Sequence, residues 1–334
     1  MNKKNPYLQI FIYGFLLIYV LLTLLPFYWT ILTSIKHSID AFSRVPLLIS
    51  FKPTMDNYIH LWLKAPVKTF APYGIGILVI IVIMILVAIF ANRIPINKTY
   101  IYLGMAVITL AIIFGLPKVV QMAEFYSYFL HSVIVTVGVV VVSISIGCMA
   151  GYGLARYRGL LGVVILVVAL AFRALPGTAF VLPYFYIGRL SGLYDTYILL
   201  ILSLVACNQP FTIWMLRSFF MEIPREIEEA AMIDGAGRLT AFVRVIIPIM
   251  WPGIITTALF SLMLAYSDFF FALMLTLTKW TLPVGIVQFT GGEDPGHIMM
   301  ASAASVSISI PIVFVIIFFQ KYLIKGLGAG AVKG

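Results

Sequence analysis

Residues Ile223–Gly253, IPREIEEAAMIDGAGRLTAFVRVIIPIMWPG, form the longest charge-rich stretch in a sequence that is otherwise almost entirely apolar. Pro224 suits the first turn of a helix, because its missing N–H has no intrahelical partner there. The acidic residues that follow lie near the positive end of the helix dipole. Asp234-Gly235 is a turn signal that ends this short helix. We therefore expect two short polar helices that lead into an apolar segment at Val245.

The side chains of the first short helix suggest two contacts. Arg225 and Glu229 are four residues apart and can pair on the outer surface. The small Ala230 and Ala231 let another backbone or side chain come close. An ordinary amphipathic surface helix and a helix that docks on a partner are both compatible with this pattern.

The composition is that of a membrane protein. The chain has 334 residues, of which 62% are apolar and 10% charged, whereas a soluble domain is about half apolar and about a quarter charged. The net charge of +10 comes from basic residues scattered over short loops, so we expect no nucleic-acid partner. Cys148 and Cys207 lie in apolar runs and the histidines show no ligand spacing, so no metal site is predicted.

Apolar runs of about 20 residues predict membrane-spanning segments. In lipid every backbone polar group must bond internally, so these segments are predicted to be helices and the fold class to be all-α and polytopic. The eight candidates are Leu8–Leu32, Tyr73–Ala91, Tyr100–Leu116, Tyr128–Leu154, Leu160–Tyr184, Tyr197–Leu216, Val245–Met274 and Ile298–Leu323.

Loop charge predicts the orientation. With the N-terminus inside, the basic loop Ala155–Arg158 faces the cytoplasm and the acidic loop Gly291–Asp294 faces out, as the positive-inside rule requires. The same orientation places the Glu229 loop and both termini in the cytoplasm.

The charged stretch also resembles a known family. Glu229–Ala231, then Asp234–Ala236, then Pro248 resemble the EAA loop of ABC importer permeases. In that family the loop is the cytoplasmic coupling helix, which rests in a cleft on the ATPase subunit. The resemblance therefore implies that these residues couple this chain to an ATPase.

The resemblance extends to the smaller, maltose-type permease subunit of carbohydrate importers. Ala150–Tyr157 is similar to its AGYALAR segment, and Pro210–Trp214, Thr281–Gly285 and the tail Gly326–Gly334 also resemble it. This implies a six-span type I core with about two extra spans inserted after the first.

The implied domains are residues 1–62, the first span and an outer loop; residues 63–124, the inserted pair of spans; and residues 125–334, the permease core. The core includes the coupling loop at about 217–246 and a cytoplasmic tail.

The implied function is that of a permease subunit, not an enzyme, of a sugar importer in a prokaryotic inner membrane. Its expected partners are a second homologous permease subunit, two ABC ATPase subunits, an extracytoplasmic solute-binding protein and membrane lipid. No G-x-x-x-x-G-K-[ST] phosphate loop occurs in the sequence, so we expect no cofactor in this chain and expect ATP and Mg to bind the ATPase subunits.

Four residues are candidates for the solute pathway. Arg173 and Asp268 are ionisable groups in or near spans, where a charge costs about 2.5–3.5 kcal/mol and usually faces a cavity or a partner. Tyr266 and Phe269 could stack on sugar rings. Snorkelling of Arg173 and helix capping by Asp268 are the structural alternatives.

An outer loop that contains Gly291, Gly292 and Asp294 reaches the solute-binding protein in the family, although alone it would be a plain connector. Importers of another solute, such as a polyamine or glycerol phosphate, remain an alternative. A stand-alone secondary transporter would predict two similar halves or acidic relays in spans, and neither pattern is visible to us.

Overall fold

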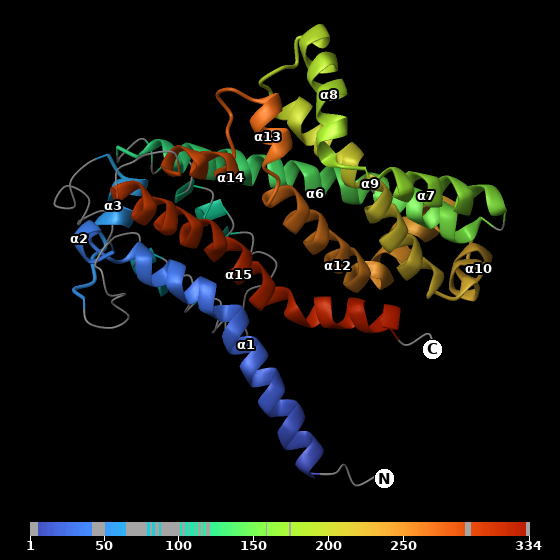
Figure 1. The fold of residues 1–334 in the computed structure, drawn as a ribbon. Coiled ribbons are helices and arrows are strands. Elements are labelled where there is room, and N and C mark those ends of the chain that lie inside the picture. Colours follow the sequence, from blue (N-terminus) through green and yellow to red (C-terminus); the bar gives the residue numbers. More distant parts are fainter. Residues whose placement is uncertain are drawn as a thin grey trace. The chain divides into compact units, whose positions relative to one another are not determined.

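The computed structural model describes residues 6–41, 51–64, 121–157, 159–173, 175–290 and 295–331, with isolated positions between 79 and 117. The helices, labelled in Figure 1 where there is room, are α1 Pro6–Ser34, α2 Ser38–Ala41, α3 Asp56–Trp62, α6 Glu124–Arg156, α7 Leu160–Phe172, α8 Gly177–Ser191, α9 Tyr197–Met221, α10 Arg225–Ile233, α11 Arg238–Ala241, α12 Ile247–Tyr266, α13 Phe270–Leu275, α14 Leu282–Gly285 and α15 Pro295–Ala331. The predicted all-α polytopic fold is confirmed.

Five of the described helices are long and apolar enough to cross a membrane, or six spans if the bent pair α7–α8 counts as one. The five segments are Gln9–Ser34, Glu124–Arg156, Tyr197–Met221, Arg238–Tyr266 and Gly296–Leu323. The expected spans 73–91 and 100–116 lie outside the described residues, apart from isolated positions.

The expected span Leu160–Tyr184 does not form one uninterrupted helix. The chain forms α7 and α8 instead, and their axes are bent by 95°. The break falls before Pro176, because proline clashes with a helical conformation of the residue that precedes it.

The expected span Val245–Met274 was wrong after Tyr266. The helix ends at Tyr266, and α13 begins at Phe270. Between them, Asp268 Oδ1 accepts hydrogen bonds from the backbone N–H groups of Phe271 (3.0 Å) and Ala272 (3.4 Å). A carboxylate that satisfies the free N–H groups of a helix start favours a new helix over continuation of the old one.

The start of that span contains a local widening. A π-helical segment, Phe242–Ile246, joins α11 to α12. Pro248 has no N–H to donate to the carbonyl of Arg244, and π turns are one way in which a helix accommodates such a missing bond.

The chain divides into two compact units, residues 1–127 with 289–306 and residues 128–288 with 307–334. In the first unit, Tyr58 Oη and Ser34 Oγ lie 2.7 Å apart, and Asn57 Nδ2 donates to the carbonyls of Ser34 and Lys36. The ring of Trp62 packs edge-on against Phe125, with centroids 5.0 Å apart.

In the second unit α6 packs closely against α9. A Cβ added at Gly151 would lie 3.0 Å from the backbone nitrogen of Arg217, and one added at Gly147 would lie 2.8 Å from Leu216 Cδ1. Glycines four residues apart let two helices approach in a membrane, where packing replaces the hydrophobic effect. The two helices therefore form a tightly packed pair.

A polar network also crosses the second unit. Ser143 Oγ on α6 donates to Gln209 Oε1 (2.9 Å) and Thr212 Oγ1 (3.1 Å) on α9. Thr212 Oγ1 lies 3.1 Å from Ser261 Oγ on α12. Each polar atom is paired inside an apolar environment, so the network helps to hold the three helices in one register.

Candidate coupling site and solute pathway

The charged stretch forms α10 and ends in a left-handed turn. Gly235 has φ of +89°. Its N–H donates to the carbonyl of Met232 (3.1 Å), and the N–H of Ala236 donates to the carbonyl of Ala231 (3.0 Å). This is the Schellman pattern, which satisfies the last carbonyls of a helix and favours glycine at the left-handed position.

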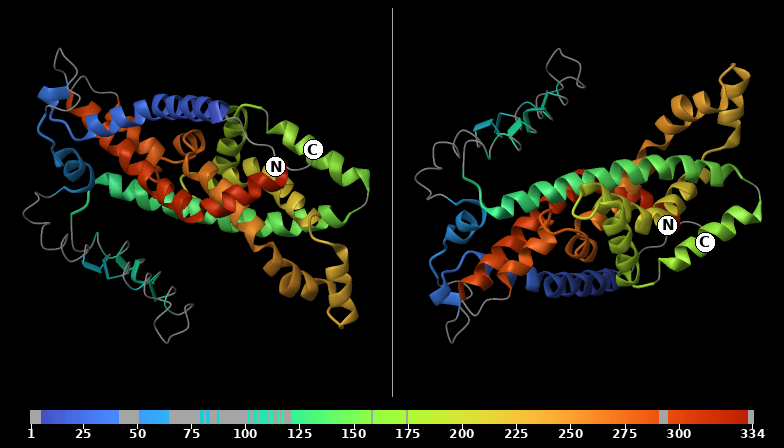
Figure 2. Two further views of the ribbon diagram at one scale, coloured as in Figure 1. Left: turned by 90° about the horizontal axis from the view of Figure 1, so that it is seen from below. Right: turned by 90° about the horizontal axis from the view of Figure 1, so that it is seen from above.

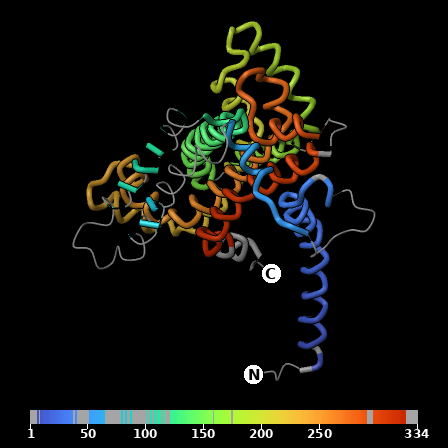
Figure 3. Tube along the Cα trace, turned by 90° about the vertical axis from the view of Figure 1, so that its left-hand side faces the viewer, coloured from blue at the N-terminus to red at the C-terminus, as the bar shows by residue number. Residues whose placement is uncertain are grey.

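One face of α10 is open to the surroundings. Glu229 and Ala230 are exposed. Two large aliphatic side chains flank the turn, Ile233 (86% exposed) and Leu239 (74% exposed). Figure 2 shows α10 at the edge of its unit in both views, and Figure 3 shows it at a different edge from α8. An exposed face with acidic and aliphatic groups is suited to a protein partner.

The other face of α10 forms hydrogen bonds and an ion pair with α6. Arg156 Nε donates to Glu228 Oε2 at 2.9 Å, and Tyr152 Oη donates to Glu228 Oε1. The expected pairing of Arg225 with Glu229 was wrong: Arg225 Nη2 donates to the carbonyl of Arg156 at 3.2 Å. The two ion pairs that the described residues form are Arg156–Glu228 and Lys279–Asp195.

Sequence reasoning missed Glu228, Tyr152 and Arg156. The available signal was the spacing of Tyr152 and Arg156, which are four residues apart and hence on one helix face. Glu228 stands beside Glu229 and could not be distinguished from it without knowing which face α6 covers.

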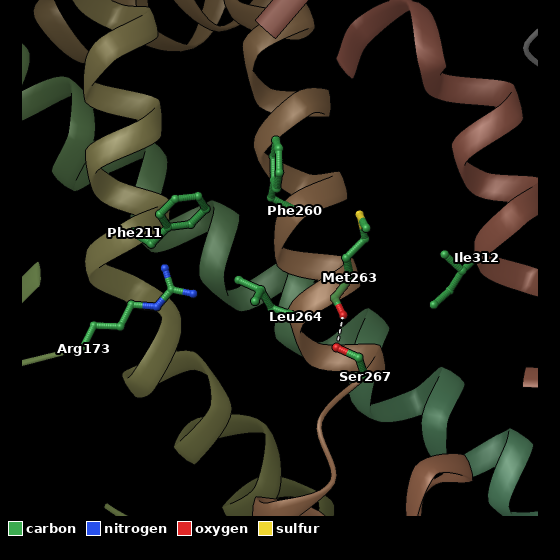
Figure 4. A pocket seen from close by; sticks show the side chains of 7 residues that line it. All are labelled: Arg173, Phe211, Phe260, Met263, Leu264, Ser267 and Ile312. Atoms are coloured by element: carbon green, nitrogen blue, oxygen red, sulfur yellow. Dashed lines mark hydrogen bonds between the residues drawn. The ribbon is translucent and has the colours of Figure 1, made fainter. Parts of the chain in front are cut away.

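A pocket of about 390 Å³ lies in the second unit. Its lining residues are Arg173, Phe211, Phe260, Met263, Leu264, Ser267 and Ile312. Figure 4 shows the Arg173 guanidinium reaching toward Phe211, and its Cζ lies 4.7 Å from the ring centroid. The pocket is open on one side and lined mainly by apolar side chains, with Arg173 and Ser267 as its polar groups.

The structure places only one of the four predicted pathway residues, Arg173, in this pocket. Tyr266 is buried, and its Oη donates to the carbonyl of Ile308 at 3.0 Å. Asp268 caps α13, and Phe269 packs edge-on against Phe270 with centroids 5.8 Å apart. The predicted loop residues Gly291, Gly292 and Asp294 lie outside the described residues.

A second polar cluster, which sequence reasoning also missed, joins the loop after α8 to the loop after α13. Asp195 accepts hydrogen bonds from the N–H groups of Leu277 (2.9 Å) and Thr278 (3.0 Å) and from Thr278 Oγ1 (2.7 Å). Burial alone would raise the pKa of Asp195, but the bonds from Thr278 and Leu277 and the charge of Lys279 outweigh it and lower the pKa to about 2. The carboxylate therefore stays ionised in its hydrogen-bonded position.

Known proteins resemble this chain in sequence and in fold. Residues 143–328 match the family of the binding-protein-dependent transport system inner membrane component. The trehalose/maltose transport system permease protein MalG of Thermococcus litoralis is 37% identical over 217 residues, which cover 63% of this chain and 77% of MalG. The inner membrane ABC transporter permease protein YcjP of Escherichia coli is 28% identical over 337 residues, which cover 100% of this chain and 99% of YcjP.

A solved structure shares the fold. It is the crystal structure of a bacterial ABC transporter involved in the import of the acidic polysaccharide alginate, with a TM-score of 0.65 and 20% identity over 96% of this chain and 98% of that chain. The family match covers more than half of this chain. The chain thus belongs to the binding-protein-dependent inner membrane components of ABC transporters, and it is a permease subunit.

Proposed function

We propose that this chain is one of two pore-forming subunits of an ATP-driven sugar importer. Support for a sugar comes from relatives named for trehalose/maltose and trehalose transport, each 37% identical to this chain. The second pore-forming subunit would be a homologous permease. The two ATPases would bind ATP and Mg, and a solute-binding protein would deliver the sugar from outside.

The single observation that carries the coupling proposal is the exposed face of α10. Glu229, Ala230 and Ile233 are free to enter a cleft on an ATPase, while Gly235 sets the turn that presents them. In this proposal closure of the ATPases around ATP displaces α10, and the membrane helices open alternately to the two sides.

The proposed orientation places α10 and both chain ends in the cytoplasm. The solute passes near Arg173, whose guanidinium can donate hydrogen bonds to sugar hydroxyls from the pocket wall. The acidic loop at 291–294 then faces the binding protein. This arrangement follows the positive-inside rule, which tracks where short basic loops remain.

Thiol labelling tests the orientation. Cys148 and Cys207 are replaced by alanine, and a single cysteine is introduced by Ile233→Cys or by Leu277→Cys, both at exposed positions. A membrane-impermeant maleimide should label the first variant only in inside-out vesicles and the second only in right-side-out vesicles. Labelling of the first variant from outside would overturn the proposal.

Reconstitution tests the activity. The permease pair and ATPases are placed in vesicles with the binding protein outside, and uptake of radiolabelled trehalose and maltose is measured with and without internal ATP. Uptake that needs both ATP and the binding protein is the expected result. Uptake by the isolated chain without nucleotide would refute the coupling mechanism. ATP-driven uptake of a polyamine or glycerol phosphate instead of a sugar would refute the assignment of a sugar as the solute.

A further inference from the structure

The ends of three helical segments meet at one guanidinium in the second unit. Arg156 is the last residue of α6. Its Nε donates to Glu228 on α10, and its Nη1 donates to the carbonyl of Phe220 (3.5 Å) in the last turn of α9 and to that of Ile223 (3.2 Å) just after α9. The Nη2 of Arg225 donates a hydrogen bond to the carbonyl of Arg156. One side chain thus contacts α10 and the end of α9 while belonging to α6.

This contact is held by more than one kind of force. The side chains of Arg156 and Glu228 are only 16% and 12% exposed, so removal of either partner leaves a poorly solvated charge. The Phe220 carbonyl, which also accepts the N–H of Ile223 at 3.3 Å, lies at the C-terminal end of α9, where the negative end of the helix dipole favours a cation. Arg156 thus bonds both a carboxylate and backbone carbonyls, while its Nη2 has no hydrogen-bond partner among the described residues.

Tyr152 secures the second oxygen of Glu228. Its Oη donates to Glu228 Oε1, and its ring packs against Phe220 and Phe242 with centroids 5.6 and 4.6 Å apart. Both carboxylate oxygens of Glu228 are thus bonded to residues of α6, one helical turn apart. The neighbouring Glu229 remains exposed. Of these two adjacent glutamates, Glu228 therefore bonds to α6, while Glu229 faces away from it.

We propose that Tyr152, Arg156 and Glu228 form a joint that passes the displacement of α10 to α6 and α9, with Arg156 and Glu228 as positioning residues. The inference rests on the proposed docking of α10 on an ATPase. Gly147 and Gly151 keep α6 in close contact with α9. A displacement of α10 that acts on Arg156 would therefore move α6 and α9 together. Packed helices linked by charged hydrogen bonds are the physical route by which two sites become coupled.

The test separates docking from transmission in the complete importer, reconstituted in vesicles with its binding protein. Three quantities are measured: a crosslink from Ile233→Cys to the ATPase, the rate of ATP hydrolysis, and solute uptake per ATP hydrolysed. Glu228→Gln should keep the crosslink and hydrolysis but lower uptake per ATP about tenfold, within the usual range of coupling energies. The matched control is Glu222→Gln, an exposed glutamate just before α10, which should leave all three unchanged.

Each result has a defined meaning. An unchanged uptake per ATP in Glu228→Gln overturns the joint, whereas an absent crosslink in the otherwise unaltered importer overturns the docking proposal instead. If Glu228→Gln fails to assemble, Tyr152→Phe decides, because it removes one hydrogen bond and keeps the ring stack. Uptake per ATP should then fall by about fivefold, the lower end of typical coupling, and an unchanged ratio overturns the joint.

Discussion

Replacement of Gly235 by alanine tests the turn that presents α10. With φ of +89°, an L side chain at this position crowds its own backbone at a cost of about 1–2 kcal/mol. Among the described residues no heavy atom lies within 4 Å of an added Cβ, so the cost is conformational and not steric. We expect the amides of α10 and its turn to exchange about 5- to 30-fold faster, the factor that corresponds to such an energy.

The assay is hydrogen–deuterium exchange, followed by mass spectrometry, on the full chain in lipid nanodiscs. Gly237→Ala is the matched control, because Gly237 has φ of −66° and equally open space. It should change exchange by no more than about twofold, as surface substitutions do. Gly235→Asn should fall between the two, because asparagine tolerates the left-handed region. Equal acceleration in both alanine variants, or none in Gly235→Ala, would refute the reasoning.

Three further changes test other parts of the structure. Gly151→Val should lower the melting temperature through about 1–3 kcal/mol of overpacking, whereas Gly153→Val, which meets open space in the described structure, should not. Asp195 has its pKa lowered to about 2, so its stabilising contribution is complete above its unfolded value of about 3.9 and is lost as the pH falls toward 2. The melting temperature of Asp195→Asn should accordingly differ from that of the unaltered chain by a constant amount between about pH 8 and pH 5. This difference in melting temperature should shrink only below about pH 4. A difference that already shrinks near pH 6 would contradict this prediction. Arg173→Gln should raise the solute concentration for half-maximal uptake in vesicles, and an unchanged value would remove Arg173 from the pathway.

Local sequence was sufficient where the deciding contacts are local. The start of α10 after Pro224 and its end at Ile233, before the turn at Gly235, follow from groups no more than a few residues apart. Long apolar runs predicted the spans for the same reason, because a helix in lipid satisfies its own backbone. The breaks were misjudged, since a cap such as Asp268 competes with helix continuation over only a few residues and the outcome depends on the surrounding packing.

Tertiary structure decided which residues of α10 bond within the chain and which stay exposed. Glu228 and Glu229 are equivalent in local sequence, yet only Glu228 meets Arg156, 72 residues away in the chain. Arg225 likewise bonds the carbonyl of Arg156 and not Glu229. Local chemistry determines that a helix forms and where it stops, but which face it buries depends on the helix that packs against it, and only the folded chain brings that helix within hydrogen-bonding distance.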